Sequence, residues 1–226
     1  MFQGFTQDAV DFLWGIRFHN ERNWFLAHKE EYLTFVDRPM RQLADEVGRV
    51  MTEAYPELGL ECKVSRIYRD ARRLHGRGPY KDHLWFSLRH RSQSEGAQPS
   101  FYFELAPEYY SYGMGCYDPT PETMAKLRAR IDRDPAPLEQ LARRLNRQKE
   151  FVLEGKLYQR AKGDPGKLLY PWYNRRQLVL SSDHNCEGQL FTPELTKQVL
   201  EGFRFLVPYY CYLNNLQGDP PPNQLN

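Results

Sequence analysis

The sequence predicts an α+β fold, in which N-terminal and C-terminal helices flank an antiparallel sheet of about four to five strands. Three observations support this prediction. Apolar residues recur at helical spacing up to about residue 55, alternate with polar residues between about 63 and 114, and return to helical spacing from about 120. Because helices and strands occur in separate runs, the order differs from the strand–helix alternation of a parallel α/β sheet.

Helical signals open the chain. Thr6 is a good N-cap for a first helix, and Asn20 can cap a second, longer helix that begins at about residue 21. Pro39 must kink or interrupt this second helix, because proline has no N–H to donate and clashes with the preceding turn. We expect the helix to end at Tyr55 and Pro56.

The central part of the chain is typical of strands separated by short polar segments. The expected strands cover residues 63–69, 84–89, 101–106 and 109–114, and one more covers 177–182. Strands that follow one another this closely favour antiparallel pairing.

Capping signatures mark the later helices. Thr120 and Thr192 are each followed by proline and glutamate, so each places an N-cap before a proline at the first helical position. Another helix is expected over about 138–149. Pro208 is expected to interrupt the last helix, and we expect residues 217–226 to form a disordered tail.

Length and composition indicate one sizeable domain, which we expect to span residues 1–216. The chain has 226 residues, of which 41% are hydrophobic, enough for a well-formed core. Its net charge of +2 argues against a protein that coats nucleic acid along its whole surface.

The same composition predicts a soluble, cytoplasmic protein. The N-terminus lacks the basic region of a signal peptide, and no run approaches the roughly 20 apolar residues of a membrane span. The four cysteines are scattered, without paired metal-ligand spacing, and we expect them to be thiols in a reducing compartment.

Positive charge concentrates between residues 61 and 92. This segment holds nine Lys/Arg and three Asp/Glu, a net charge of +6, whereas the whole chain carries +2. The rest of the chain therefore sums to −4. Such a focus of positive charge favours an anion-binding site.

Residues 65–81, at the centre of this segment, supply the candidate ligand-binding residues. They are Arg66, Arg69, Asp70, Arg72, Tyr80 and Lys81. Arginine binds carboxylates and phosphates bidentately but cannot act as a base near neutral pH. We expect the three arginines to hold an anion, Asp70 to orient one of them, and Tyr80 and Lys81 to complete the rim. The alternative is a buried Arg–Asp network that only stabilises the fold.

Trp24, His28 and Glu104 are candidate second contributors to this site. His28 lies one helical turn from Trp24, and its ordinary pKa would let it act as a general base. The alternative for His28 is a hydrogen-bonded residue at the edge of the core. Glu104, on the polar face of the expected third strand, could pair with an arginine or act as a catalytic carboxylate.

Two further patterns have a structural and a functional interpretation. The turn at 76–79 could present backbone N–H groups to a phosphate, but it matches neither a Walker loop nor a dinucleotide fingerprint, and a plain tight turn accounts for it. Tyr109, Tyr110, Tyr112 and Tyr117 could stack on bases or fill half-buried strand positions. We expect no metal and no cofactor.

Several motifs together match the pattern of one protein family. They are Phe2-x-Gly4-Phe5, Asn23-Trp24-Phe25 with His28-Lys29 and Tyr32, Pro39-Met40, the set Arg66, Arg69, Asp70, Arg72, Pro79, Tyr80 and Lys81, then Phe101-Tyr102-Phe103-Glu104 and Gly113-Met114-Gly115. In this combination the chain resembles the bacterial family catalogued as domain of unknown function 2461. The resemblance covers most of the chain and implies no established activity.

Four positions depart from the pattern that the resemblance implies. Arg73 stands where the family usually has phenylalanine, and Gly76 replaces an acidic or amide residue. Arg77 replaces a lysine and Gly78 a small polar residue. The lost second acid argues against a carboxylate-pair mechanism and makes the segment more basic, which suits an anionic ligand.

We therefore expect a protein that binds, and could act on, a small molecule bearing a phosphate or a carboxylate. A nucleic-acid-associated module is the second expectation, and it predicts affinity that falls steeply with salt. The third is a structural or interaction protein whose motif only holds the fold together. The residue pattern specifies no reaction.

Overall fold

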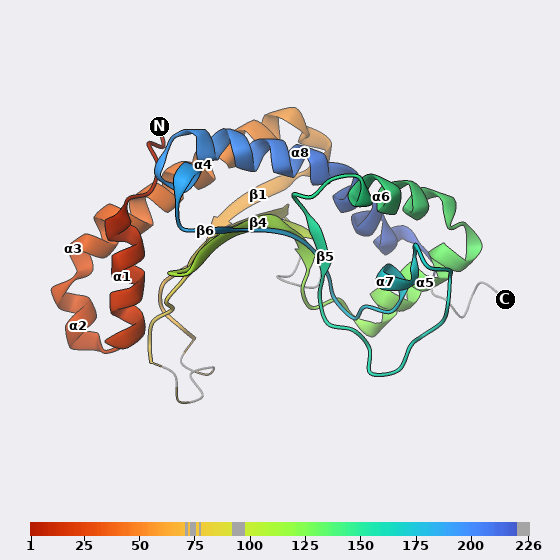
Figure 1. Ribbon diagram of the computed structural model, residues 1–226, viewed down its shortest axis with the longest axis horizontal. Helices are drawn as coiled ribbons and strands as arrows, with labels where there is room; N and C mark the ends of the chain where they lie inside the picture. Colours follow the sequence, from red (N-terminus) through yellow and green to blue (C-terminus); the bar gives the residue numbers. More distant parts are fainter. Residues whose placement is uncertain (71, 73–75, 77, 92–97, 221–226) are drawn as a thin grey trace. The chain divides into compact units, whose positions relative to one another are not determined.

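The strands of the computed structural model form an antiparallel sheet in the order β1-β2-β3-β4-β6-β5 (Figure 1). The structure describes residues 1–226 except 71, 73–75, 77, 92–97 and 221–226. The strands are β1 (Leu60–Val64), β2 (Leu84–His90), β3 (Ser100–Leu105), β4 (Tyr109–Cys116), β5 (Val152–Glu154) and β6 (Leu178–Asn185). The predicted α+β class and the antiparallel sheet are confirmed.

The predicted strand number of four to five was wrong, because the described residues form six strands. The strand that sequence patterns missed is β5, whose three residues are too few to show an alternation. Strand β1 also lies earlier than the expected 63–69. Between Val64 and β2 the described residues make one isolated β-bridge, which joins Tyr68 to Tyr80.

Helices precede and follow the run of strands β1 to β4. The α-helices are α1 (Gln7–Phe18), α2 (Arg22–Ala27), α3 (Lys29–Glu31), α4 (Arg38–Ala54), α5 (Pro121–Arg133), α6 (Ala136–Asn146), α7 (Tyr170–Tyr173) and α8 (Glu194–Asn214). A π-helical turn, η1 (Tyr32–Asp37), joins α3 to α4, and short 3₁₀ helices occupy η2 (Pro56–Leu58), η4 (Gly188–Phe191) and η5 (Asn215–Gly218).

The two prolines expected to break helices differ in effect. Before Pro39 the chain forms η1, whose wider turn accommodates a residue that cannot donate an N–H. Pro208, by contrast, lies inside α8, and the predicted interruption there was wrong. Tyr209 and Tyr210, directly after Pro208, are almost completely buried. We attribute the continuity of α8 to this packing, which offsets the missing hydrogen bond.

The described chain divides into two compact units. Unit 1 comprises Met1–Arg91, Tyr102–Tyr112 and Asp183–Gly202, and unit 2 comprises Ser92–Phe101, Gly113–Ser182 and Phe203–Asn226. Strands β3, β4 and β6 and helix α8 each supply residues to both. The expectation of a single domain over 1–216 stays a prediction.

In unit 1, helix α4 packs against β1 and β2. Leu84, Phe86 and Leu88 of β2 are fully buried, and Cys62, opposite Leu88 in the strand register, donates its thiol hydrogen to the Ala44 carbonyl of α4 (3.5 Å). Side chains alternate along a strand, so the residues between these leucine and phenylalanine positions face away from α4.

In unit 2, Arg130 of α5 fixes the end of α8 and the segment after it. Its guanidinium donates to the Tyr212 carbonyl (2.8 Å), the Asn215 carbonyl (2.9 Å) and the Asp219 carboxylate (2.6 Å). The expected disordered tail begins inside this ordered segment, at residue 217, and its last residues, 221–226, lie outside the described part of the chain.

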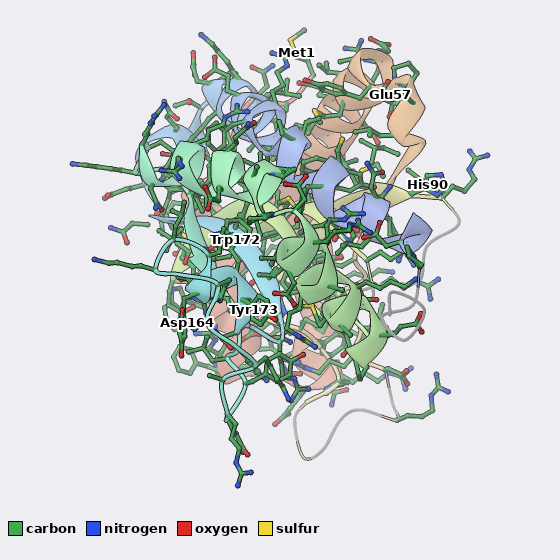
Figure 2. The ribbon with its side chains drawn as sticks, turned by 90° about the vertical axis from the view of Figure 1, so that its right-hand side faces the viewer. Met1, Glu57, His90, Asp164, Trp172 and Tyr173 are labelled. Carbon is green, nitrogen blue, oxygen red and sulfur yellow. The ribbon has the colours of Figure 1, made fainter. Side chains whose placement is uncertain are left out.

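The segment before β6 is held by α7, whose Trp172 and Tyr173 are labelled in Figure 2. The Tyr173 hydroxyl donates to Asp132 of α5 (2.9 Å). The buried Asn174 side chain accepts from the Lys162 N–H (2.5 Å) and donates to the Gly163 carbonyl (2.9 Å). These bonds hold a stretch rich in glycine and proline in a defined conformation.

Among the described residues, no helix combines the length and the apolar character needed to cross a membrane.

Candidate functional site

The two ends of the 65–81 segment pair with one another. Tyr68 and Tyr80 form the antiparallel bridge, the Arg69 N–H donates to the Pro79 carbonyl (2.8 Å), and the Lys81 N–H donates to the Ile67 carbonyl (2.7 Å). The segment is therefore an extra hairpin outside the regular strands. Residues 71, 73–75 and 77, which include the family departures Arg73 and Arg77, lie outside the described part of the chain.

Asn20 anchors this hairpin to the segment between α1 and α2. Its side-chain amide accepts from the Tyr80 N–H (2.9 Å) and donates to the Tyr80 carbonyl (2.9 Å), so it pairs as another strand would. Its predicted role as a helix cap was wrong, because Glu21 occupies the N-cap of α2. A Cβ atom on Gly78 would lie 2.2 Å from Asn20 Oδ1, which explains why glycine stands there.

Arg69 makes its contacts inside the protein. Its Nε donates to the Tyr80 carbonyl (2.7 Å), and its Nη2 lies 3.5 Å from Asp82 Oδ1. The Tyr80 ring is 4% exposed and stacks on Phe25 of α2, with ring centroids 4.3 Å apart. Arg69 and Tyr80 thus join the hairpin to its surroundings.

Asp70 and Arg72 pair with each other at the surface. Arg72 donates from Nε to Asp70 Oδ1 (3.2 Å) and from Nη2 to Oδ2 (3.1 Å), and its backbone N–H also donates to Oδ1 (3.0 Å). The Arg72 side chain is 89% exposed. Asp70 therefore orients an arginine that remains accessible to a ligand.

Lys81 stands between Arg66 and Trp85. Its Nζ donates to the backbone carbonyl of Arg66, whose side chain is exposed. The same Nζ lies 4.4 Å from the centroid of the Trp85 ring, a cation–π distance. The His83 ring stacks on Trp85 as well, with centroids 5.5 Å apart.

Asp82 joins this hairpin to α1. It accepts from Arg17 Nε (2.6 Å) and His83 Nδ1 (3.0 Å) and lies close to Arg69. Burial alone would raise the Asp82 pKa, but the hydrogen bonds from Arg17 and His83 outweigh it and hold the pKa below its ordinary value. Arg17 also pairs with Glu108, and this hydrogen bond lowers the pKa of Glu108.

The Asp82 contact fixes the tautomer of a neutral His83. A carboxylate only accepts hydrogen bonds, so Nδ1 must carry the hydrogen and Nε2 keeps its lone pair. His83 is partly exposed, at 31% of its side-chain surface. In this tautomer Nε2 can accept a hydrogen bond.

A row of polar and aromatic residues follows β2 on the side opposite α4. We name it the β2 stripe, and it consists of Lys81, His83, Trp85, Ser87 and Arg89. Lys81 and His83 belong to it because both contact the Trp85 ring. Arg89 Nη1 is buried and has no hydrogen-bond partner among the described residues. Glu61 stands opposite Arg89 in the β1–β2 register, but no ion pair joins them.

Two of the second contributors, Trp24 and His28, belong to α2 and its C-terminal end, whereas Glu104 lies on β3, the strand next to β2. Trp24 stacks on His28, with ring centroids 4.1 Å apart, and His28 Nδ1 lies 2.8 Å from the Trp24 carbonyl. No hydrogen bond or ring contact joins Trp24 or His28 to the described residues of 65–81, and α2 reaches Tyr80 through Phe25 instead. Glu104 accepts from the Tyr109 hydroxyl (2.9 Å). The pKa of Tyr109 is raised, mainly by burial and secondly by the negative charge of Glu104.

The four tyrosines near β4 divide by exposure. Tyr110 and Tyr112 are almost completely buried, and both stack on His184 of β6. Tyr109 and Tyr117 are each 38% exposed. Stacking on bases is therefore open only to the last two.

Unit 2 carries a separate basic cavity of about 730 Å³. Arg160, Lys162 and Arg176 line it together with one acid, Asp118. The Lys162 ammonium lies 4.8 Å from the centroid of the Tyr158 ring. No cluster of three or more His, Cys, Asp or Glu side chains that could bind a metal occurs among the described residues.

Sequence reasoning identified Lys81 of the β2 stripe as a site residue. It missed the cluster in which Asp82 contacts His83 and Arg17, and Arg17 contacts Glu108. Alternation was the available signal for the stripe, because residues 81, 83, 85, 87 and 89 share a period of two. Arg17 is separated from Asp82 by 65 positions and from Glu108 by 91, and no local pattern connects them.

Comparison with known proteins identifies the family. No curated protein matches the chain. A family model described as "Conserved hypothetical protein (DUF2461)" matches residues 8–212, which is most of the chain. The protein therefore belongs to the DUF2461 family, as its motifs predicted.

Proposed function

We propose that the protein binds a small molecule carrying a phosphate or carboxylate group, and that the β2 stripe together with Arg66 forms the binding surface. The observation that carries this proposal is the unpartnered Arg89 Nη1 on the face of β2 turned away from α4. A buried guanidinium N–H without an acceptor is costly, and an unseen anion or water is an ordinary explanation for one. An anion on the stripe would satisfy it after a rotation of the Arg89 side chain that turns this buried N–H toward the open face.

The rest of the stripe suits a ligand whose ring or chain extends along β2 from its anionic group, because Trp85 lies four residues from Arg89, roughly 13 Å along an extended strand. Trp85 offers a half-buried aromatic surface, and the Lys81 ammonium lies close to it. His83 Nε2 is available to accept a ligand hydrogen bond or proton. Lys81 and Arg66 would add charge at one end of the stripe, and Arg89 at the other.

The other candidate residues take supporting roles in this proposal. Arg69 and Tyr80 position the hairpin that carries Lys81, since their contacts are internal. Asp70 holds Arg72 toward the rim. We also infer that the protein is cytoplasmic, because its four cysteines are scattered along the chain without paired spacing, as is usual where thiols stay reduced.

A thermal-shift panel tests the proposal. The wild type is heated with phosphate, citrate, AMP and a single-stranded 12-mer oligonucleotide, at low and high salt. We expect at least one small anion to raise Tm, because a ligand that binds only the folded state stabilises it. Arg89→Gln should abolish that rise and Lys81→Gln should reduce it, while Arg176→Gln, which removes a cation from the separate cavity of unit 2, should keep it.

The other outcomes decide between the alternatives. A rise with the oligonucleotide alone, lost at high salt, would indicate a nucleic-acid interface. A rise that Arg176→Gln abolishes would place the anion in the unit 2 cavity. If no compound raises Tm and Arg69→Ala lowers the stability of the free protein, the motif serves only the fold.

A further inference from the structure

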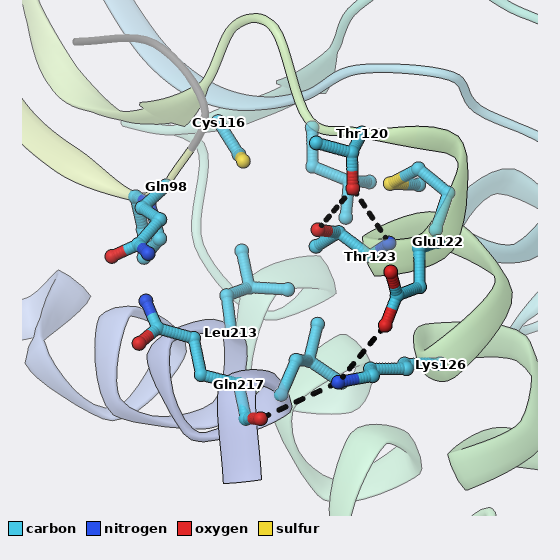
Figure 3. A pocket seen from close by; sticks show the side chains of 12 residues that line it. Gln98, Cys116, Thr120, Glu122, Thr123, Lys126, Leu213 and Gln217 are labelled. Atoms are coloured by element: carbon cyan, nitrogen blue, oxygen red, sulfur yellow. Dashed lines mark hydrogen bonds and ion pairs between the residues drawn. The ribbon is translucent and has the colours of Figure 1, made fainter. Parts of the chain in front are cut away.

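A second cavity, of about 360 Å³, opens beside the first turn of α5 in unit 2 (Figure 3). Its apolar wall is formed by Met124, Leu178, Leu213 and Leu216. This volume is at the lower end of the range for small-molecule sites and corresponds to about twelve water molecules in the liquid. A mostly apolar wall with a few polar groups is typical of such sites.

Two glutamine amides provide the polar end of the cavity. The side chains of Gln98 and Gln217 point toward the same part of it in Figure 3. Gln98 Oε1 is buried and accepts no hydrogen bond from any described residue. A buried acceptor without a donor costs free energy, so a ligand toward which the Gln98 amide rotates, and which donates a hydrogen bond to this oxygen, would gain affinity.

The charged groups in the cavity already compensate one another. The Lys126 ammonium, whose side chain is 13% exposed, lies 3.5 Å from the Glu122 carboxylate and donates to the Gln217 carbonyl (3.4 Å). Burial raises the pKa of the Cys116 thiol to about 12, so this group lines the cavity in neutral form. An added charge would find no unmatched partner, and its burial would be expensive.

At the start of α5, a backbone N–H is likewise already paired with a group of the protein. Thr120 Oγ1 accepts from the Thr123 N–H (3.1 Å) and lies 2.9 Å from the Thr123 hydroxyl. The cap therefore uses the N–H that could otherwise receive an anion. Both observations favour an uncharged ligand.

We propose that this cavity binds a neutral, partly apolar molecule with a carboxamide or lactam group. Such a group has a donor and an acceptor side by side, which matches a glutamine amide bidentately. The ligand N–H would donate to Gln98 Oε1, and the ligand oxygen would accept from the side-chain amide of Gln217. The hydrocarbon part of the ligand would lie against Leu213 and Leu216. This site lies in unit 2 and is independent of the β2 stripe of unit 1.

Three matched probes test the inference by ligand-observed NMR and titration: benzamide, benzoate and toluene. Benzamide carries the expected group, benzoate is its charged isostere, and toluene lacks a polar group. We expect benzamide to bind at least tenfold more tightly than either of the other two. Gln98→Leu and Gln217→Leu should each weaken benzamide at least tenfold, whereas Gln159→Leu, which changes an exposed glutamine elsewhere in unit 2, should leave it unchanged.

Each remaining outcome overturns the inference. Benzoate binding more tightly than benzamide would make the cavity an anion site at Lys126, and equal binding of toluene would remove the role of the amides. Failure of benzamide to bind the wild type at millimolar concentration would also contradict it. Circular dichroism establishes that each leucine variant is folded, and the two variants test the amides separately.

Discussion

At the residue scale, Asn20 has the most consequential contact that a local pattern could not predict. Its sequence position suggested a helix cap, yet its amide bonds both backbone groups of Tyr80, 60 positions away. Cap preference is a property of the residue and its immediate neighbours, whereas this partner becomes adjacent only after folding. The same holds for Arg17 with Asp82.

Replacing Asn20 by alanine should lower the free energy of unfolding by about 2 kcal/mol. The change leaves the Tyr80 N–H and carbonyl without their partner, and an unsatisfied buried group costs about 1–3 kcal/mol. Urea denaturation measures the loss as a lower midpoint at unchanged slope. Asn23→Ala, at an exposed position of α2, is the matched control and should change the midpoint little. Equal losses in the two variants would contradict the anchoring role of Asn20.

Asp82→Asn should destabilise the protein at pH 7 by about 1.5–3 kcal/mol, because it weakens charge-assisted hydrogen bonds. Folding depresses the Asp82 pKa below its ordinary value of about 3.8. The contribution of the carboxylate is therefore fully present above that value and is lost as the pH falls through the folded-state pKa. The stability difference between wild type and variant should shrink below pH 4.

Unfolding free energies at pH 7, 4 and 3 measure this difference. Glu53→Gln is the control, because Glu53 pairs with Arg49 at the surface (3.4 Å) and both side chains are 64% exposed. Such a pair contributes at most about 1 kcal/mol. A gap between wild type and Asp82→Asn that stays constant or widens toward pH 3 would mean that Asp82 does not stabilise the fold through its charge.

At the scale of elements, sequence patterns succeeded where side-chain periodicity was long enough to read. Strands β2, β3 and β4 lie close to the expected ranges. Buried and partly exposed positions alternate along β2, whereas every position of β3 except Glu104 and every position of β4 except Tyr109 is buried, so there the alternation lies in the residue types and not in the burial. Three-residue β5 is too short for this signal. The two predicted threonine caps differ in their bonds. The Thr120 side chain accepts from the Thr123 N–H and so caps α5, whereas the Thr6 hydroxyl donates to Asp8 (3.2 Å) and makes no cap bond to α1.

The N-terminal segment depends on a glycine that no other residue can replace. Gly4 has φ +104°, and a Cβ atom there would lie 2.4 Å from the backbone carbon of Phe191. Phe5 beside it is 2% exposed and donates its N–H to the Leu190 carbonyl (3.0 Å). Close approach of two backbones is therefore what fixes this segment on η4.

Gly4→Ala should cost at least about 2 kcal/mol of stability, because it combines a strained φ with a backbone clash. Gly188→Ala is the matched control: its φ is +58°, and no atom lies within 4 Å of the added Cβ. Strain alone should cost about 1–2 kcal/mol there. Urea midpoints compare the two variants, and a control loss as large as that of Gly4→Ala would rule out the proposed backbone contact.

At the scale of the whole molecule, the charge distribution predicted the basic segment. It could not predict which of its cations form internal contacts and which remain exposed. A net charge of +6 over residues 61–92 is visible in the sequence. Which cations face inward depends on tertiary contacts: Arg69 is held by the Tyr80 carbonyl, while Arg72 stays exposed beside Asp70. The unpartnered Arg89 Nη1 is visible only after folding.

The measurement that tests the central claim most directly is an NMR titration of the tryptophan indole N–H signals with phosphate, citrate and AMP at low salt. The chain has four tryptophans, and Trp85→Phe assigns the signal from the β2 stripe. Anion binding on the stripe predicts that the Trp85 signal moves saturably, while that of Trp172, buried in unit 2, stays in place. A Trp85 signal that does not move with any of the three anions, or a shift confined to Trp172, would contradict the claim.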